Sequence, residues 1–172
     1  MKLAQQMEKW MGMSDAVWLR HANPWSGWTR VPILPLLALA IWSRVWIGAW
    51  AWGAVVLVLV WIWLNPRAFP VPERFDNWMT RGVLGERVFL DHFEALAPHH
   101  QRASKLLGYA SFPGLMVMVW GLWPQDAQST LFGTVLCMLP KLWFIDRMVW
   151  ILQDWERAGH AVPGLPEGTT DV

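Results

Sequence analysis

The sequence contains little cysteine, little charge and no catalytic signature. Cys137 is the only cysteine among 172 residues, so the chain cannot form a disulfide within itself, and cysteine usage indicates no redox compartment. Charged residues make up 16% of the chain and the net charge is +1, which excludes a strongly basic nucleic-acid-binding protein. Because no segment matches a known catalytic motif, spacing alone assigns no reaction.

Long uncharged runs are the most informative feature that is present. One extends over twenty-two residues from Val45 to Pro66, and another over twenty residues from Leu106 to Gln125. At about 1.5 Å per helical residue, each can cross a hydrocarbon layer of about 30 Å. With 55% hydrophobic residues and a mean hydropathy of +0.25, the composition predicts an integral membrane protein. The first thirty residues lack the apolar core of a secretory signal, so we expect them to be retained.

Hydrophobic periodicity and turn residues predict an all-α membrane protein with four transmembrane helices in two hairpins and two amphipathic helices on the cytoplasmic side. Asn23 as N-cap and Pro24 at the first helical position predict the start of the first span, and Asn65-Pro66 predicts the end of the second. The predicted segments are an amphipathic segment over 1–20, a first hairpin over 24–64 (spans 24–43 and 46–64), a surface helix over 82–97, and a second hairpin over 103–155 (spans 103–123 and from about 129). Residues 1–158 form one domain and 159–172 a flexible tail.

Basic residues set the predicted orientation. Thirteen of the fourteen Lys and Arg residues lie in the N-terminal segment, the central connection or the C-terminal end, and only Arg44 lies in a tight turn. The positive-inside rule therefore predicts a multi-pass protein of the cell inner membrane with both termini in the cytoplasm. We expect Arg44 to snorkel to the outer headgroups. Most of the sixteen Trp residues fall at the ends of the spans, as in two aromatic belts.

Polar side chains gather at the predicted cytoplasmic side. The candidates are His21, Asn23, Arg67, Glu86, Arg87, His99, His100, Asp146 and Arg147. Three interpretations remain open. The first is a transition-metal site at His21, Glu86, His99 and His100. The second is an ionic lattice that holds the helices together, and the third is a headgroup-phosphate site at Arg67, Arg87 and Arg147. The lattice is favoured over the metal, because the histidines lack the i, i+4 spacing of a helical metal motif. No cofactor is assigned, and haem or pigment binding is left undecided.

The ionic lattice makes two specific predictions. Arg87 and Asp91 are four residues apart on a helix, so they are expected to pair. Asp146 lies on an otherwise apolar helix, where a carboxylate is costly unless a cation replaces its water. Arg147 is adjacent in sequence and points about 100° away. The expected partner is therefore an arginine of another segment, Arg67 at the end of the second span before Arg87.

Short ordered blocks resemble a known family. The blocks are His21-Ala22-Asn23-Pro24-Trp25-Ser26, Trp28-Thr29-Arg30, Asn65-Pro66-Arg67 and Gly85-Glu86-Arg87. They resemble a family of small prokaryotic integral membrane proteins catalogued as a domain of unknown function, over nearly the whole stretch from His21 to about Trp155. The resemblance implies a multi-helix membrane protein and supplies no activity. It also implies that His21, Asn23, Arg67, Glu86 and Arg87 form one constellation.

Three classes of function follow from these features. The first is a non-catalytic subunit or scaffold of a membrane complex or homo-oligomer, with membrane lipids and other membrane subunits, or itself, as partners. Small size, short loops and abundant tryptophan favour this class. The second is a small membrane enzyme with a metal or lipid site at the His/Glu/Arg cluster. A transporter or channel is the least favoured, because no charged residue lies in the middle of a predicted span.

Overall fold

The structure, a computed structural model, describes residues 11–165. All regular secondary structure in this range is helical, which confirms the all-α prediction for these residues. In chain order the elements are α2 (Asp15–His21), α3 (Pro24–Arg30), α4 (Ile33–Trp42), α5 (Arg44–Ile47), η1 (Gly48–Trp50), α6 (Ala51–Ala68), α7 (Trp78–Asp91), η2 (Phe93–Ala95), α8 (Pro98–Leu122) and α9 (Ala127–Arg157).

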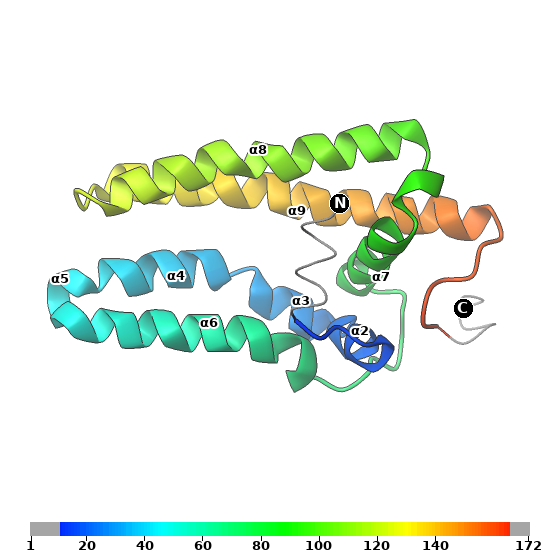
Figure 1. The fold of residues 1–172 in the computed structure, drawn as a ribbon, viewed down its shortest axis with the longest axis horizontal. Helices are drawn as coiled ribbons and strands as arrows, with labels where there is room; N and C mark the ends of the chain where they lie inside the picture. Colours follow the sequence, from blue (N-terminus) through cyan, green and yellow to red (C-terminus); the bar gives the residue numbers. More distant parts are fainter. Residues whose placement is uncertain (1–10, 166–172) are drawn as a thin grey trace.

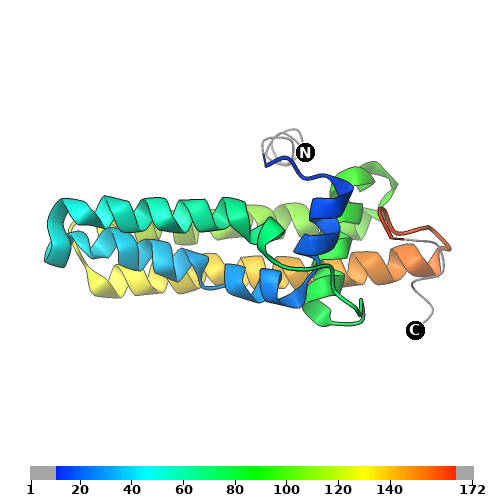
Figure 2. The ribbon, with the colours of Figure 1, turned by 90° about the horizontal axis from the view of Figure 1, so that it is seen from below.

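Two antiparallel helical hairpins lie side by side and form most of the molecule (Figure 1). The first consists of α4 and α6, joined at its tip by α5 and η1, and the second consists of α8 and α9. Both tips lie at the same end of the molecule, and the view turned by 90° shows the same arrangement (Figure 2). We call the opposite end, made of α2, α3, α7, η2 and the C-terminal part of α9, the base.

The first predicted span, 24–43, is divided into two helices. It begins as predicted, because the Asn23 side chain accepts a hydrogen bond of 3.0 Å from the Trp25 N–H and Pro24 occupies the first helical position. The helix is then interrupted at Pro32, and α4 starts at Ile33. Proline has no N–H and its ring collides with the carbonyl four residues earlier, so the prediction of one continuous helix is wrong here.

In α6, by contrast, a proline does not interrupt the helix. This helix was predicted to end at Asn65-Pro66, but it continues to Ala68 with Pro66 inside it. A proline in the last turn removes only one backbone hydrogen bond. Arg67 Nη1 also donates to the carbonyl of Trp63 at 2.6 Å, which holds this side chain against its own helix.

The predicted surface helix over 82–97 is instead a buried helix, α7, over Trp78–Asp91. It crosses the base and packs against α9. A Cβ atom added at Gly85 would lie 2.6 Å from the carbonyl carbon of Met148, so the missing side chain allows the two backbones to touch. The charges that suggested a surface position do not prevent burial, because Arg87 is paired within the protein.

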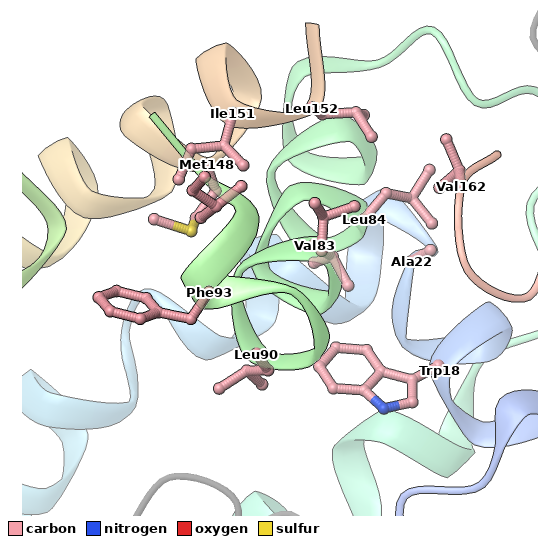
Figure 3. Packing of buried hydrophobic residues seen from close by; sticks show 12 residues of the cluster. Trp18, Ala22, Val83, Leu84, Leu90, Phe93, Met148, Ile151, Leu152 and Val162 are labelled. Atoms are coloured by element: carbon pink, nitrogen blue, oxygen red, sulfur yellow. The ribbon is translucent and has the colours of Figure 1, made fainter. Parts of the chain in front are cut away.

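The larger hydrophobic core lies in the base, around the crossing of α7 with α9 (Figure 3). Its buried members are Trp18, Ala22, Val83, Leu84, Val88, Leu90, Phe93, Leu96, Met148, Ile151, Leu152 and Val162. A smaller cluster of Ala38, Met118 and Leu122 joins the two hairpins. The base therefore has the inward-facing core of an ordinary globular domain, whereas the hairpins share only a narrow one.

Both ends of the described chain pack onto the base. In α2, Trp18 and His21 are buried, so the described part of the segment predicted over 1–20 rests on protein. The predicted flexible tail begins with a turn at Gly159, whose φ is +77°, and Val162 then enters the core. A loose tail is thus wrong for its first residues, because an apolar side chain reaches the core. The predictions for 1–10 and 166–172 lie outside the described residues.

Within residues 11–165, two helical stretches are long and apolar enough to cross a membrane, Pro24–Ala68 and Pro98–Leu122. The first doubles back at its tip and so provides two antiparallel helices (Figure 1). Only 6% of its most apolar window and 33% of that of the second is buried. The apolar side chains of these stretches therefore face mainly outward.

Candidate functional site

A chain of side-chain hydrogen bonds joins α2, α3 and α6 in the base. The Arg30 guanidinium donates to His21 Nε2, and His21 Nδ1 lies 2.9 Å from Ser26 Oγ. Ser26 donates to Asn65 Oδ1 at 2.8 Å, and Asn65 Nδ2 donates to Thr29 Oγ1 at 2.8 Å. His21, Ser26 and Asn65 are buried. We call these five residues the base network.

The bonds of the base network have one consistent direction. A guanidinium only donates, so His21 Nε2 accepts and carries no proton. The proton then lies on Nδ1, which donates to Ser26, and the Ser26 hydroxyl donates onward to Asn65. Burial, followed by the nearby charge of Arg30, holds the pKa of His21 well below its usual 6.5. His21 is therefore neutral and fixed in one tautomer, with both ring nitrogens bonded inside the protein.

Asn23 and Arg67 attach neighbouring segments to this region. The Asn23 amide donates to the Pro70 carbonyl at 3.0 Å, which holds the chain after α6 against the start of α3. Arg67 donates to the Met11 carbonyl, and its guanidinium lies 4.4 Å from the centroid of the Trp63 ring. These two residues and His21, which the resemblance grouped together, thus lie in one part of the base.

The Gly85-Glu86-Arg87 block lies on α7, where Arg87 joins two elements. Its guanidinium donates to Asp15 in α2, and its Nε lies 3.7 Å from Asp91 Oδ2 one turn later. The predicted pairing of Arg87 with Asp91 is confirmed. Glu86 is half-buried on the same helix. Because Arg87 itself is buried, its two carboxylates offset the cost of removing its charge from water.

The histidines of the predicted metal site lie in two different places. His99 and His100 begin α8 and lie beside Asp154 near the end of α9, and one donor atom from each residue falls within 4.8 Å of the other two. Among residues 11–165 this is the group that can hold a metal ion. His21 and Glu86 are not part of it, so the predicted four-residue site is wrong. The second hairpin brings the start of α8 beside the end of α9, and the base network holds His21.

Asp146 does not pair with Arg67, so that prediction is also wrong. Its Oδ1 accepts a 3.1 Å hydrogen bond from the Trp78 indole N–H, and it forms no ion pair with another described residue. The reason is that α7, rather than the end of α6, packs against this part of α9. The Arg147 guanidinium lies 5.8 Å from the centroid of the Trp150 ring, and its Nε is buried without a hydrogen-bond partner among the described residues.

Several residues of these sites were not singled out as candidates from the sequence. They are Ser26, Thr29, Arg30 and Asn65 of the base network, and Asp154 beside the two histidines. The first four do occur in the short blocks that carry the family resemblance, so a signal was present. Asp154 lies in a charged stretch near the end of α9 and carries no comparable signal.

Fold and sites together define an all-helical protein with two apolar hairpins closed at one end by a hydrogen-bonded base. The family model described as a family of unknown function (DUF6653) matches residues 2–168. The chain belongs to this family, which confirms the resemblance to a family of unknown function. No curated protein and no solved structure matches the chain.

Proposed function

We propose that this chain is a non-catalytic subunit or scaffold of an inner-membrane complex, and that it packs against other membrane proteins or against a second copy of itself. In this proposal four helices span the bilayer, namely α3 continued by α4, α6, α8 and the first part of α9. Apart from α3, the base then lies at the cytoplasmic surface. Polar side chains hold the base together, and the apolar hairpins provide the surface for partners and lipid.

Outward-facing apolar side chains on both hairpins support the membrane location. Trp50 and Leu57 of the first hairpin are 82% and 71% exposed, and Trp123 and Leu131 of the second are 87% and 68% exposed. Apolar surface in water costs about 25 cal/mol per Å², and soluble monomers rarely expose large contiguous apolar patches. Hydrocarbon removes this cost, so a bilayer is the surrounding that fits these hairpins.

The packing of α8 against α9 supports a spanning role for the first part of α9. This part carries no charge from Ala127 to Pro140, and small residues line its contact with α8. A Cβ atom at Gly114 would lie 2.7 Å from Cys137 Cα, and one at Gly133 would lie 2.6 Å from Met118 Cα. Membrane helices associate through such small residues, because lipid provides no hydrophobic drive between them.

The distribution of basic residues supports the orientation. Those in the described residues lie toward the base, with the exception of Arg44 at the tip of the first hairpin. Arg44 donates to the carbonyls of Leu122 and Trp123 at the end of α8. The C-terminus of a helix attracts positive charge, so Arg44 has a partner within the protein at the hairpin tips. Snorkelling to the outer headgroups is therefore not needed to explain a cation away from the cytoplasmic side.

The non-catalytic part of the proposal rests on the base network, because its buried polar groups are already hydrogen-bonded to one another. His21 is the only histidine in the resemblance blocks, and both of its ring nitrogens are bonded within the protein. Ser26 and Asn65 are bonded to each other at 2.8 Å. A catalytic acid, base or nucleophile must reach a substrate proton or atom. Polar groups that are buried and bonded to one another instead stabilise a fold.

Photo-crosslinking in native membranes tests the proposed role. A photoreactive amino acid at Leu57 or Leu131 faces away from the molecule, and the same amino acid at buried Met148 serves as the matched control. We expect Leu57 or Leu131, and not Met148, to give a protein adduct heavier than the 19.9 kDa chain. Adducts with lipid alone at both exposed positions would contradict the proposal.

Cysteine labelling tests the orientation independently. Single cysteines at Glu73 in the base and Gln125 at the tip of the second hairpin, in a Cys137→Ser background, are exposed. An impermeant reagent added outside the cell is expected to label the Gln125 site and to spare the Glu73 site. Labelling of the Glu73 site from outside would overturn the topology.

A further inference from the structure

His99, His100 and Asp154 gather where the second hairpin is open at its base. His99 and His100 lie in the first turn of α8, and Asp154 lies in the last turn of α9. Their donor atoms lie within 4.8 Å of one another. The two imidazole rings are 4.1 Å apart between centroids and tilted by 39°. Two helix ends that are far apart in the sequence thus place three metal-ligating side chains together.

His100 holds a nitrogen that the protein does not use. The side chain is 3% exposed, and its Nε2 lies 2.9 Å from Asp154 Oδ2. Its Nδ1 is buried without a hydrogen-bond partner among the described residues. A buried nitrogen without a partner is costly, and a bound ion that recruits it, or turns the ring, removes that cost.

The charge and chemistry of the group fit a zinc-type cation. Asp154 is exposed, and an exposed aspartate is a carboxylate at neutral pH. Imidazole and carboxylate donors bind zinc at about 2.0–2.2 Å, which requires donor atoms about 3.5 Å apart in a tetrahedral site. His99 and Asp154 are exposed, so their side chains can rotate to close this spacing.

One neighbouring cation competes for the same carboxylate. Arg157 Nη1 lies 3.2 Å from Asp154 Oδ1, and the Arg157 side chain is 75% exposed. An exposed ion pair of this kind contributes little to stability. It engages Oδ1, so a metal ion that takes Oδ2 replaces the hydrogen bond from His100 and leaves the arginine in place.

We propose that His99, His100 and Asp154 bind one divalent transition-metal ion of the zinc class, with water in the remaining coordination position. The ion clamps the start of α8 to the end of α9, and so closes the second hairpin at its base. This site goes beyond the proposed scaffold role and does not depend on it.

Metal titration of the full chain tests the site. The protein is purified with a tag free of histidine and stripped with a chelator, and Zn²⁺ binding is then measured by competition with a fluorescent zinc chelator. We expect one Zn²⁺ per chain. His99→Ala and Asp154→Asn are each expected to weaken Zn²⁺ binding at least tenfold. The matched control is His160→Gln, which removes an exposed histidine whose ring lies against Trp155 outside the donor group.

The choice of variants keeps the test decisive. His100 is buried, and its replacement can disturb the fold, whereas His99 and Asp154 are exposed and their replacement leaves the core intact. The proposal is overturned if the wild-type chain binds no Zn²⁺ at micromolar concentration. It is equally overturned if both exposed-site variants keep wild-type affinity, or if His160→Gln loses as much affinity as they do.

Discussion

The two hairpins consist of similarly apolar helices, but different contacts hold them together. The first is joined below by side-chain hydrogen bonds, with Asn65 of α6 bonded at 2.8 Å to both Ser26 and Thr29 of α3, the helix that leads into α4. The second is joined along its length by glycines such as Gly114 and Gly133, at which α8 and α9 come into backbone contact. Where lipid gives helices no hydrophobic reason to associate, polar pairs and close packing are the two remaining means.

The largest expected effect concerns two glycines of α8, Gly114 at the contact with α9 and Gly108 away from it. A Cβ atom at Gly114 would lie 2.6 Å from the Leu136 carbonyl carbon, whereas one at Gly108 would meet nothing within 4 Å. Gly114→Ala is therefore expected to lower the free energy of unfolding by about 1–3 kcal/mol or more. Gly108→Ala, the matched control, is expected to raise it by about 0.5–1 kcal/mol. Denaturant titration in detergent micelles measures both, and equal effects would contradict the role given to Gly114.

Loss of the central residue of the base network comes next. Asn65→Ala leaves the buried Ser26 hydroxyl without its acceptor, and an unsatisfied buried group costs about 1–3 kcal/mol. The half-buried Thr29 loses one donor and still donates to the Trp25 carbonyl. We expect a loss of about 2–3 kcal/mol in the same titration. The control is Ser111→Ala, because this buried hydroxyl bonds only to the Leu107 carbonyl of its own helix. Its expected effect is below about 0.5 kcal/mol, and a similar loss in both variants would refute the special role of Asn65.

The pH dependence of stability is the third effect. The folded-state pKa of His21 is lowered by burial and then by Arg30, so the unfolded chain binds more protons as pH falls through about 6.5. The free energy of unfolding is thus highest above about pH 6.5 and decreases below it, by at most about 1.4 kcal/mol per pH unit from this group. Unfolding measured from pH 7.5 to 5 is expected to show this slope, and His21→Gln to remove it. An unchanged slope in the variant would show that His21 is charged or solvated in the fold.

The smallest expected effect concerns the contact between the hairpin tips. Arg44 donates to the carbonyls of Leu122 and Trp123, so Arg44→Gln is expected to cost about 0.3–1 kcal/mol, the usual value of a cation at the C-terminus of a helix. Arg44→Lys keeps the charge and is expected to cost less. The charge contributes nothing if the lysine and glutamine variants are equally stable.

The sequence predicted the arrangement of the chain better than its internal contacts. The uncharged runs, Asn23-Pro24 and the Arg87–Asp91 spacing are local signals, and the helices, the cap and the ion pair follow from them. Pro32 interrupts a helix and Pro66 does not, although both lie in helical patterns. Their effects differ because Pro66 lies in the last turn of its helix, where the lost hydrogen bond is close to the helix end.

The error at Asp146 has one physical cause, which is the position of α7. The pattern of charges on this helix suggested a surface position, and Gly85 was not recognised as a contact with Met148. With α7 buried against α9, Trp78 rather than Arg67 becomes the partner of Asp146. The metal-ligating group depends in turn on which helix ends are neighbours, and the spacing of histidines along the chain carries no such information.

The most direct test of the central claim is a double-mutant cycle between Ser26 and Asn65, whose side chains are bonded at 2.8 Å across the first hairpin. The free energies of unfolding of Ser26→Ala, Asn65→Ala and the double variant are compared with that of the wild type. If the base network holds the first hairpin together, the two losses are coupled by about 0.5–3 kcal/mol, and the double variant loses less than their sum. Strictly additive losses would contradict the claim that polar bonds join this hairpin.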